Sequence, residues 1–176
     1  MKIDVSNIHD EPLRFDESLQ LGPQRLDESL VLGSVSVQLA GAVRSVGDGV
    51  LIDGRYQAEA SLACSRCLEP VQWRVSDEFS VEYRSPAASP AEEEVKLDGG
   101  EMDVSFLLGE SLDLEDVAAE QVLLALPVRI VCDDDCAGLC PRCGANRNVD
   151  DACSCGPEVD PRWEALRDLS GTDTAN

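Results

Sequence analysis

Eight cysteines are the residues of this chain whose type and spacing suggest chemistry. Each lies two to four positions from a partner, and the four pairs are Cys64 and Cys67, Cys132 and Cys136, Cys140 and Cys143, and Cys153 and Cys155. Cysteines this close together make strained disulfides, whereas their thiolates can converge on one metal ion. The spacing therefore favours metal binding over a disulfide framework.

The pairs are numerous enough for two complete metal sites. Structural zinc takes four tetrahedral ligands, commonly thiolates. The sequence "CPRCG" at 140–144 has the form of a knuckle found in zinc ribbons and in rubredoxin-type iron sites, with a stiff Pro141 and a Gly144 that can adopt positive φ. We expect Zn2+ in a local site of Cys140, Cys143, Cys153 and Cys155, and in a long-range site of Cys64, Cys67, Cys132 and Cys136. The alternative is one four-cysteine site within 132–155, with the first pair left as reduced thiols.

Sites made only of cysteine indicate a structural role for the metal. All four coordination positions are filled by protein, whereas catalytic zinc keeps one position open for water. The only histidine is His9, and the chain has no nucleophile-elbow, P-loop or dinucleotide-binding motif. We therefore expect no enzyme and no small-molecule substrate.

Three arginines accompany the cysteines. Arg66 and Arg142 lie inside the two C-x-x-C knuckles, and Arg147 follows the second knuckle. Their guanidinium groups could contact RNA phosphate or an acidic group of a partner. Equally, they could balance the negative charge of a metal–tetrathiolate centre.

The chain is strongly acidic, with a formal net charge of -21 from 35 acidic and 14 basic residues. Nonspecific binding to nucleic acid depends on lysine and arginine side chains that displace counterions. The charge therefore favours a basic partner, although it could also serve solubility alone. No run of about 18 apolar residues is present, and the first residues lack the apolar region of a secretory signal. We expect a cytoplasmic protein that does not contact membrane.

The elements that must position the cysteines are strands and one helix. Residues 35–84 are rich in Val and Leu with partial alternation, which predicts an antiparallel meander with turns at Asp48-Gly49 and Asp53-Gly54. Asp113 is a plausible N-cap of a helix that Pro127 ends. The predicted fold class is α+β: an antiparallel β-sheet meander covered by one main helix, with a cysteine-rich, zinc-binding C-terminal segment.

The same patterns divide the chain into four parts. Residues 1–34 are expected to be a loosely structured lead-in that packs on the core. Residues 35–131 form the α+β core, which includes a flexible acidic loop at 85–103. The cysteine-rich zinc-knuckle segment and a C-terminal helix occupy 132–170, and 171–176 form a disordered tail.

Several of these motifs also resemble a known family. The stretches are "CSRCLEPV" at 64–71, "LALPV" at 124–128, "CDDDCAGLCPRCGANRN" at 132–148, "CSC" at 153–155 and "DPRWEALRDL" at 160–169. In this order they are similar to the YceD family, whose members are known as large ribosomal RNA subunit accumulation proteins. The resemblance implies a non-enzymatic role in ribosome biogenesis that supports accumulation of large-subunit (23S) ribosomal RNA.

Three hypotheses for the molecular role follow. In the first, the protein contacts the large ribosomal subunit precursor through a basic ribosomal protein, which suits its acidity. In the second, the zinc knuckle binds ribosomal RNA directly through Arg66, Arg142 and Arg147. The third, which the sequence favours least, is a redox or iron-binding protein.

Overall fold

The main sheet is a curved, five-stranded layer. The computed structural model describes residues 1–8, 11–47, 49–84, 104–107, 109–149, 153–156 and 162. Within them the sheet order is β2-β3-β4-β5-β6. The strands are β2 (Leu13–Leu21), β3 (Val35–Val46), β4 (Gly49–Ala63), β5 (Pro70–Arg84) and β6 (Val104–Phe106). The first four are antiparallel neighbours, whereas β6 pairs with β5 in parallel.

A smaller pair of strands and one helix complete the described fold. Strand β1 (Lys2–Asp4) pairs with β7 (Ser111–Asp113), and helix α1 (Leu114–Ala125) follows directly. Two single 3-10 turns, η1 (Val5–Asn7) and η2 (Pro23–Arg25), lie in the connections. No helix in the described ranges combines the length and apolarity needed to span a bilayer.

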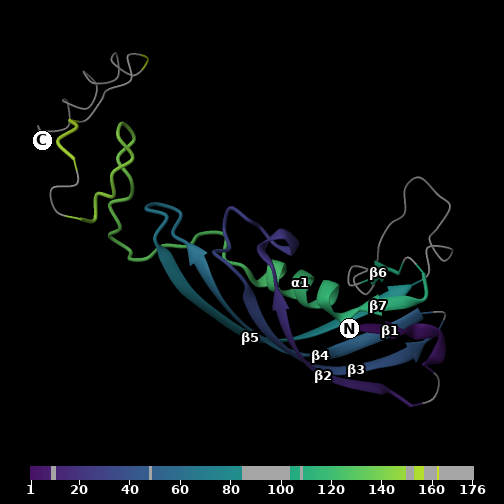
Figure 1. Cartoon of the computed structure of the whole chain (residues 1–176). Helices are drawn as coiled ribbons and strands as arrows, with labels where there is room; N and C mark the ends of the chain where they lie inside the picture. Colours follow the sequence, from purple (N-terminus) through teal and green to yellow (C-terminus); the bar gives the residue numbers. More distant parts are fainter. Residues whose placement is uncertain are drawn as a thin grey trace, which may run out of the picture.

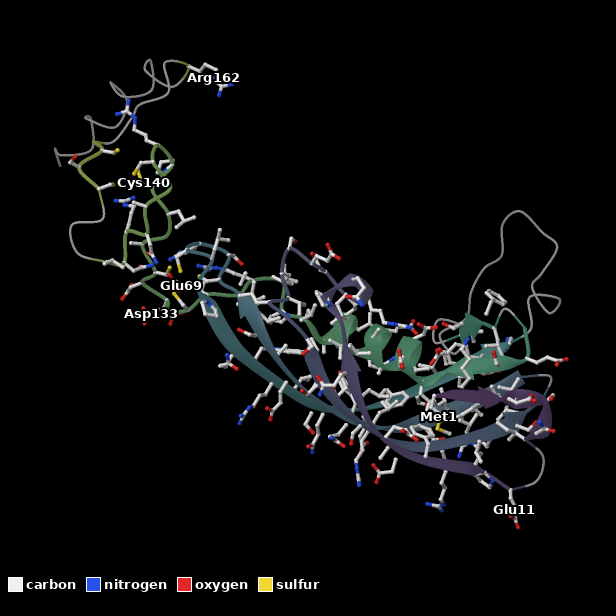
Figure 2. The ribbon with its side chains drawn as sticks, in the orientation of Figure 1. Met1, Glu11, Glu69, Asp133, Cys140 and Arg162 are labelled. Carbon is white, nitrogen blue, oxygen red and sulfur yellow. The ribbon has the colours of Figure 1, made fainter. Side chains whose placement is uncertain are left out.

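The strands separate an apolar face from a polar one because side chains alternate along each strand. On β3 the side chains of Val35, Val37 and Leu39 are buried, while the residues between them are exposed. The apolar face packs against α1, and charged side chains cover the opposite face (Figures 1 and 2). The predicted α+β class, a sheet meander covered by one main helix, is confirmed.

Helix α1 begins and ends as the sequence predicts. The Asp113 side chain accepts a hydrogen bond from the Glu115 backbone N–H at 3.1 Å, and Pro127 follows the last turn. Arg25 holds the exposed side of the first turn through Asp116 and, at 3.2 Å, through Glu115. The Tyr56 hydroxyl donates to a helix carbonyl at 3.4 Å. These contacts fix the helix on the sheet.

The predicted turn at Asp53-Gly54 is wrong. Both residues lie in the middle of β4, and the β3–β4 hairpin closes instead between Val46 and Gly49. Gly54 pairs with Gly41 of β3, and a Cβ atom on Gly41 would collide with the Asp53 carbonyl oxygen. Glycine is needed at this position because two backbones approach closely, not because the chain turns.

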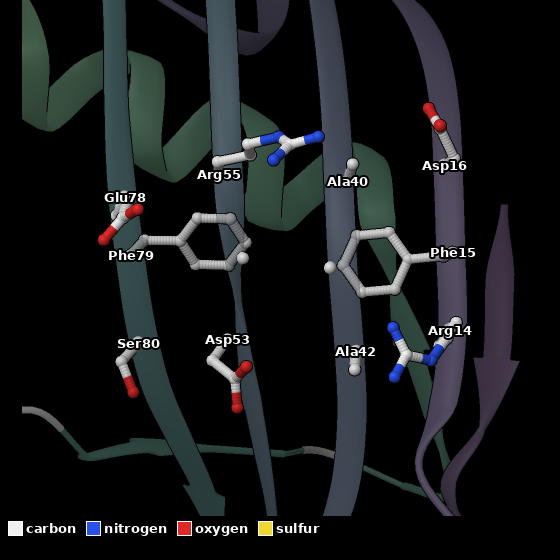
Figure 3. A pocket seen from close by; sticks show the side chains of 12 residues that line it. Arg14, Phe15, Asp16, Ala40, Ala42, Asp53, Arg55, Glu78, Phe79 and Ser80 are labelled. Carbon is white, nitrogen blue, oxygen red and sulfur yellow. The ribbon is translucent and has the colours of Figure 1, made fainter.

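Two phenylalanine rings cover this glycine pair. Phe15 lies beside Gly41 in the sheet register and Phe79 beside Gly54, so the four residues form one row across β2 to β5. The rings point toward one another across β3 and β4 (Figure 3), and both are buried. An open hollow of about 940 Å³ is lined by this row and by polar side chains of the opposite face, such as Arg55.

Residues 1–34 contribute to the sheet, although the sequence predicted a loosely structured lead-in. Strand β2 pairs with β3 along all nine of its residues. The expected acidic loop at 85–103 and the tail at 171–176 lie outside the described residues. So does the C-terminal helix, of which only Arg162 is described. The division of the chain into four parts stays a prediction.

Substitution of Gly41 by alanine tests the close approach of β3 and β4. The added methyl group must displace backbone, so we expect a loss of about 1–3 kcal/mol in the free energy of unfolding, measured by denaturant titration. Ala42→Val, one position along on the polar face, is the matched control. A loss no larger than that of the control would show that the glycine pair is not a packing requirement.

Candidate metal centres

The turn between β4 and β5 presents the first cysteine pair. The Leu68 backbone N–H donates to the Cys64 carbonyl at 2.9 Å, and the Cys64 N–H donates to the Glu69 carbonyl at 2.9 Å. These bonds curl the chain so that both sulfurs of the pair face the same side. The Arg66 N–H also points at the Cys64 sulfur, at 3.5 Å.

The segment after α1 delivers the second pair to the same place. Ser65 and Ile130 exchange hydrogen bonds: the Ser65 N–H donates to the Ile130 carbonyl at 2.8 Å, and the Ile130 N–H donates to the serine Oγ at 3.3 Å. Two residues later the Cys132 N–H lies 3.4 Å from the Cys64 sulfur. Segments more than sixty positions apart are thus held side by side.

We call the resulting cluster of Cys64, Cys67, Cys132 and Cys136 the inner centre. Its four sulfurs all lie within 4.8 Å of one another. The Cys64–Cys136 sulfur pair is separated by 3.9 Å and the Cys67–Cys132 pair by 3.5 Å. Zn–S bonds of about 2.3 Å in a tetrahedron place sulfurs about 3.8 Å apart, whereas a disulfide needs about 2.05 Å. The geometry therefore fits a metal ion.

We call the second cluster, Cys140, Cys143, Cys153 and Cys155, the outer centre. Its sulfurs also lie within 4.8 Å of one another. The knuckle repeats the bonds of the first: the Gly144 N–H donates to the Cys140 carbonyl at 2.8 Å, and the Cys140 N–H to the Ala145 carbonyl at 2.8 Å. The centre is more open than the inner one, since Cys143 and Cys155 are exposed.

The structure groups the eight cysteines as their spacing favoured. Two groups of four could each hold a metal ion, one local and one joining distant segments. The alternative with a single site in 132–155 does not match this arrangement, because Cys64 and Cys67 lie with Cys132 and Cys136. Figure 2 shows that this part of the chain, near Glu69, Asp133 and Cys140, lies beyond the end of the sheet.

The inner thiols influence one another's ionisation. Burial raises the pKa of Cys64, but backbone N–H donors, those of Arg66 and Cys132 among them, outweigh it and lower the pKa to about 6. Hydrogen bonding to Cys136 raises the pKa of Cys132 to about 12. Four such thiols can all be thiolates only with a cation among them.

The outer thiols follow the same pattern. Backbone N–H groups of Cys143 and Arg142 lower the pKa of Cys140 to about 6. Hydrogen bonding to Cys143 raises the pKa of Cys155 to about 12. A divalent cation is therefore the natural complement of both centres.

The three arginines have different surroundings. The Arg66 guanidinium Nη1 donates to the carbonyls of Asp134 at 3.1 Å and Cys136 at 2.8 Å, so this side chain braces the inner centre. Arg142 and Arg147 are exposed around the outer knuckle. All three predicted contact residues are exposed, and Arg66 differs in that its guanidinium also hydrogen-bonds the backbone beside the inner centre.

Sequence reasoning missed Leu68. It occupies the position that Gly144 holds in the second knuckle, and both residues have positive φ, 62° and 74°. A left-handed conformation costs a leucine of order 1 kcal/mol, yet the Leu68 side chain is 61% exposed. The signal was present in the sequence, since "CSRCL" carries leucine where "CPRCG" carries glycine.

Sequence reasoning also did not foresee the contacts of two asparagines, Asn146 and Asn148. The Asn148 Nδ2 donates to the Cys136 sulfur at 3.4 Å, and the Asn146 Nδ2 donates to the Glu69 side chain at 3.1 Å. Asparagine is common in turns for local reasons, so the sequence alone did not single out these contacts.

Comparison with known proteins assigns the family. Residues 52–170, which include all eight cysteines, match the family model described as large ribosomal RNA subunit accumulation protein YceD. The chain belongs to the YceD family. No solved structure matches it.

Relatives of this chain occur in mycobacteria and plants. An uncharacterized protein of Mycobacterium tuberculosis is 36% identical over 135 residues, which cover 75% of this chain and 61% of the relative. One of Mycobacterium leprae is 29% identical over 131 residues, covering 74% and 58%. A maize protein named large ribosomal RNA subunit accumulation protein YCED homolog 1, chloroplastic, is 25% identical over 131 residues, covering 60% and 44%. The chain thus spans about three fifths of the length of the mycobacterial relatives.

Elemental analysis of the purified protein tests the two centres. We expect about two metal ions per chain, and about one in Cys64→Ser or Cys143→Ser, because each loses one complete ligand set. Cys64→Ser should lower Tm by roughly 10 °C, or about 3–4 kcal/mol, and Cys143→Ser should lower it less. The inner centre ties the β4–β5 turn to the segment after α1, whereas the outer centre is local. Equal losses of Tm in both variants would contradict this distinction.

Proposed function

We propose that this protein is a non-enzymatic factor in ribosome biogenesis that supports accumulation of large-subunit ribosomal RNA. The observation that carries the proposal is the match of residues 52–170 to the YceD family, together with the printed name of the maize relative. The matched region contains both candidate metal centres, β5 and α1. These are the parts of the chain whose geometry is most specific.

The proposed metal in each centre is structural Zn2+, bound by Cys64, Cys67, Cys132 and Cys136 and by Cys140, Cys143, Cys153 and Cys155. Zinc suits four thiolates, and the separation of the inner sulfurs fits a tetrahedral zinc site. Four protein ligands leave no open position for water or substrate, which supports a role in folding and contact. A rubredoxin-like iron site would make the protein red, whereas zinc leaves it colourless.

The proposed partner is a basic ribosomal protein or a precursor particle that displays one. With 35 acidic and 14 basic residues, the chain attracts cationic surfaces. The negative charge is also concentrated at the inner centre, because three exposed carboxylates lie beside it: Asp133, Asp134 and Asp135. The proposal places the chain in the cytoplasm, whose reducing conditions keep thiols available for metal.

Leu68 is the proposed apolar contact within this acidic end. An exposed leucine in a left-handed conformation lowers stability, and glycine would remove the strain. Such a residue is better suited to contacting a partner than to stabilising the fold.

The second candidate function is direct binding of ribosomal RNA. The exposure of Arg142 and Arg147 around the outer knuckle favours it. Against it stand the exposed acids beside the inner centre and the hydrogen bonds that hold the Arg66 guanidinium to the Asp134 and Cys136 carbonyls.

Sedimentation of cell extracts tests the proposal. The protein should travel with large-subunit precursors and should bind purified ribosomal protein more tightly than naked RNA, with an affinity that falls as salt rises. The control is Arg142→Ala in a gel shift at low salt, which should change little. Tight RNA binding that this variant abolishes would support the second function, and absence from all precursor fractions would refute the first.

The Leu68→Gly variant distinguishes a role of Leu68 in contacting a partner from a role in the stability of the fold. Relief of the positive φ should keep or raise the free energy of unfolding, by up to about 1 kcal/mol. At the same time, association with the precursor should weaken by about tenfold, as loss of a buried apolar contact would cause. Leu13→Gly serves as the control, since it also removes an exposed leucine, but from β2, far from the knuckle. Unchanged association in Leu68→Gly would exclude Leu68 from the contact surface.

A further inference from the structure

Asn148 lies next to the outer centre in the sequence, but its side chain contacts the inner centre. It lies five residues after Cys143, in the loop that closes the outer knuckle. Its side chain nevertheless reaches the inner centre. The Oδ1 accepts a hydrogen bond from the Ala137 N–H at 2.7 Å, and the Nδ2 donates to the Cys136 sulfur at 3.4 Å.

The orientation of this amide is fixed by its partners. An N–H group can only donate, so the end of the side chain that faces Ala137 must be the oxygen. The amide nitrogen is then left to face Cys136, where it stabilises a thiolate. Hydrogen bonds of this kind orient metal ligands and hold their charge.

The loop that carries Asn148 is built on the outer knuckle. Residues 144–149, which we call the knuckle loop, begin with the hydrogen bond from Gly144 N–H to the Cys140 carbonyl, at 2.8 Å. The Arg147 N–H then donates to the Gly138 carbonyl at 2.8 Å, and Leu139 forms a β-bridge with Asn146. The position of the loop therefore depends on the turn that Cys140 and Cys143 form.

Asn146 links the same loop to the first knuckle. Its Oδ1 accepts from the backbone N–H of Asn148 at 3.0 Å and from the Asn148 Nδ2 at 2.8 Å. Its Nδ2 donates to the Glu69 side chain at 3.1 Å, and Glu69 accepts from the Cys64 N–H through its carbonyl. The network thus runs from the outer knuckle to two cysteines of the inner centre.

We infer that Asn148 couples the two metal centres, so that a metal ion at the outer centre strengthens metal binding at the inner one. Metal bound by the outer cysteines fixes the knuckle loop, and the fixed loop holds Asn148 against Cys136. Coupling between two binding sites is reciprocal, so a filled inner centre favours the outer one by the same factor. The inference rests on the proposed metal binding but not on the proposed role in ribosome biogenesis.

Metal release from the full-length, zinc-loaded protein tests this coupling. Excess chelator removes the zinc, and a coloured zinc indicator follows its release as two kinetic phases, one for each ion. The phase that is missing in Cys143→Ser belongs to the outer ion. In Asn148→Asp the inner ion should leave about 10–100-fold faster, the usual effect of losing a hydrogen-bonding partner of a metal ligand. This variant keeps an acceptor for the Ala137 N–H but replaces the amide donor with a carboxylate. Val149→Ala, the neighbouring exposed side chain, should release both ions at the wild-type rates.

Cys143→Ser tests the coupling without changing Asn148. Removal of the outer ion should accelerate loss of the inner ion by a similar factor, and the double variant should be no more than about threefold faster than either single one. Two results would overturn the coupling alone. One is release of the inner ion from Asn148→Asp at a rate within about twofold of wild type. The other is a double variant whose rate increase equals the product of the two single increases. A wild-type protein that binds no metal would overturn the metal assignment and the coupling together. Failure to bind precursor particles would affect neither.

Discussion

The convergence of four thiols at the inner centre is the constraint on which the cysteine-rich end of the molecule depends. Two of them come from the β4–β5 turn and two from the segment after α1, and their sulfurs lie within 4.8 Å of one another. Brought together without a cation, these groups could not all ionise, as the raised pKa of Cys132 shows. A divalent ion would remove that conflict and would cross-link the two distant segments. The inner centre also limits where the outer centre can lie, because only residues 137–139 separate Cys136 from Cys140.

The sheet determines where this cross-link lies. Strands β4 and β5 each have fifteen residues and would extend roughly 50 Å at about 3.3 Å per residue. Such a hairpin carries its turn well beyond the twelve-residue helix that covers the sheet (Figure 1). The long strands curve around α1 (Figure 1), and the Gly41–Gly54 pair, covered by Phe15 and Phe79, lets β3 and β4 approach closely. One end of the molecule is thus an aliphatic core, and the other carries the two cysteine clusters that could hold metal ions.

Much of this arrangement could be predicted from the sequence because its causes are local. Alternating apolar residues specify strands, an N-capping Asp113 and a following Pro127 delimit α1, and closely spaced cysteines specify ligand pairs. Long-range causes were harder to see. A glycine that admits a neighbouring backbone looks the same in sequence as one that makes a turn, so Asp53-Gly54 was misjudged. The polar edge strand β2 was underestimated because only one of its faces is buried. The contact of Asn148 with Cys136 depends on how two knuckles pack, which no local pattern encodes.

The account also explains how a zinc-knuckle sequence can occur in a chain of net charge -21. Its cysteines form two clusters that could each hold a metal ion, Arg66 braces the inner one, and Asp133, Asp134 and Asp135 are exposed beside it. These exposed carboxylates support the proposed basic partner over a phosphate-bearing one. X-ray absorption at the zinc edge of the purified full-length chain tests the central claim most directly. The account predicts that zinc is coordinated by four sulfur atoms at about 2.3 Å, with no lighter ligand. Coordination by nitrogen or oxygen, or cysteines oxidised to disulfides in place of bound metal, would contradict it.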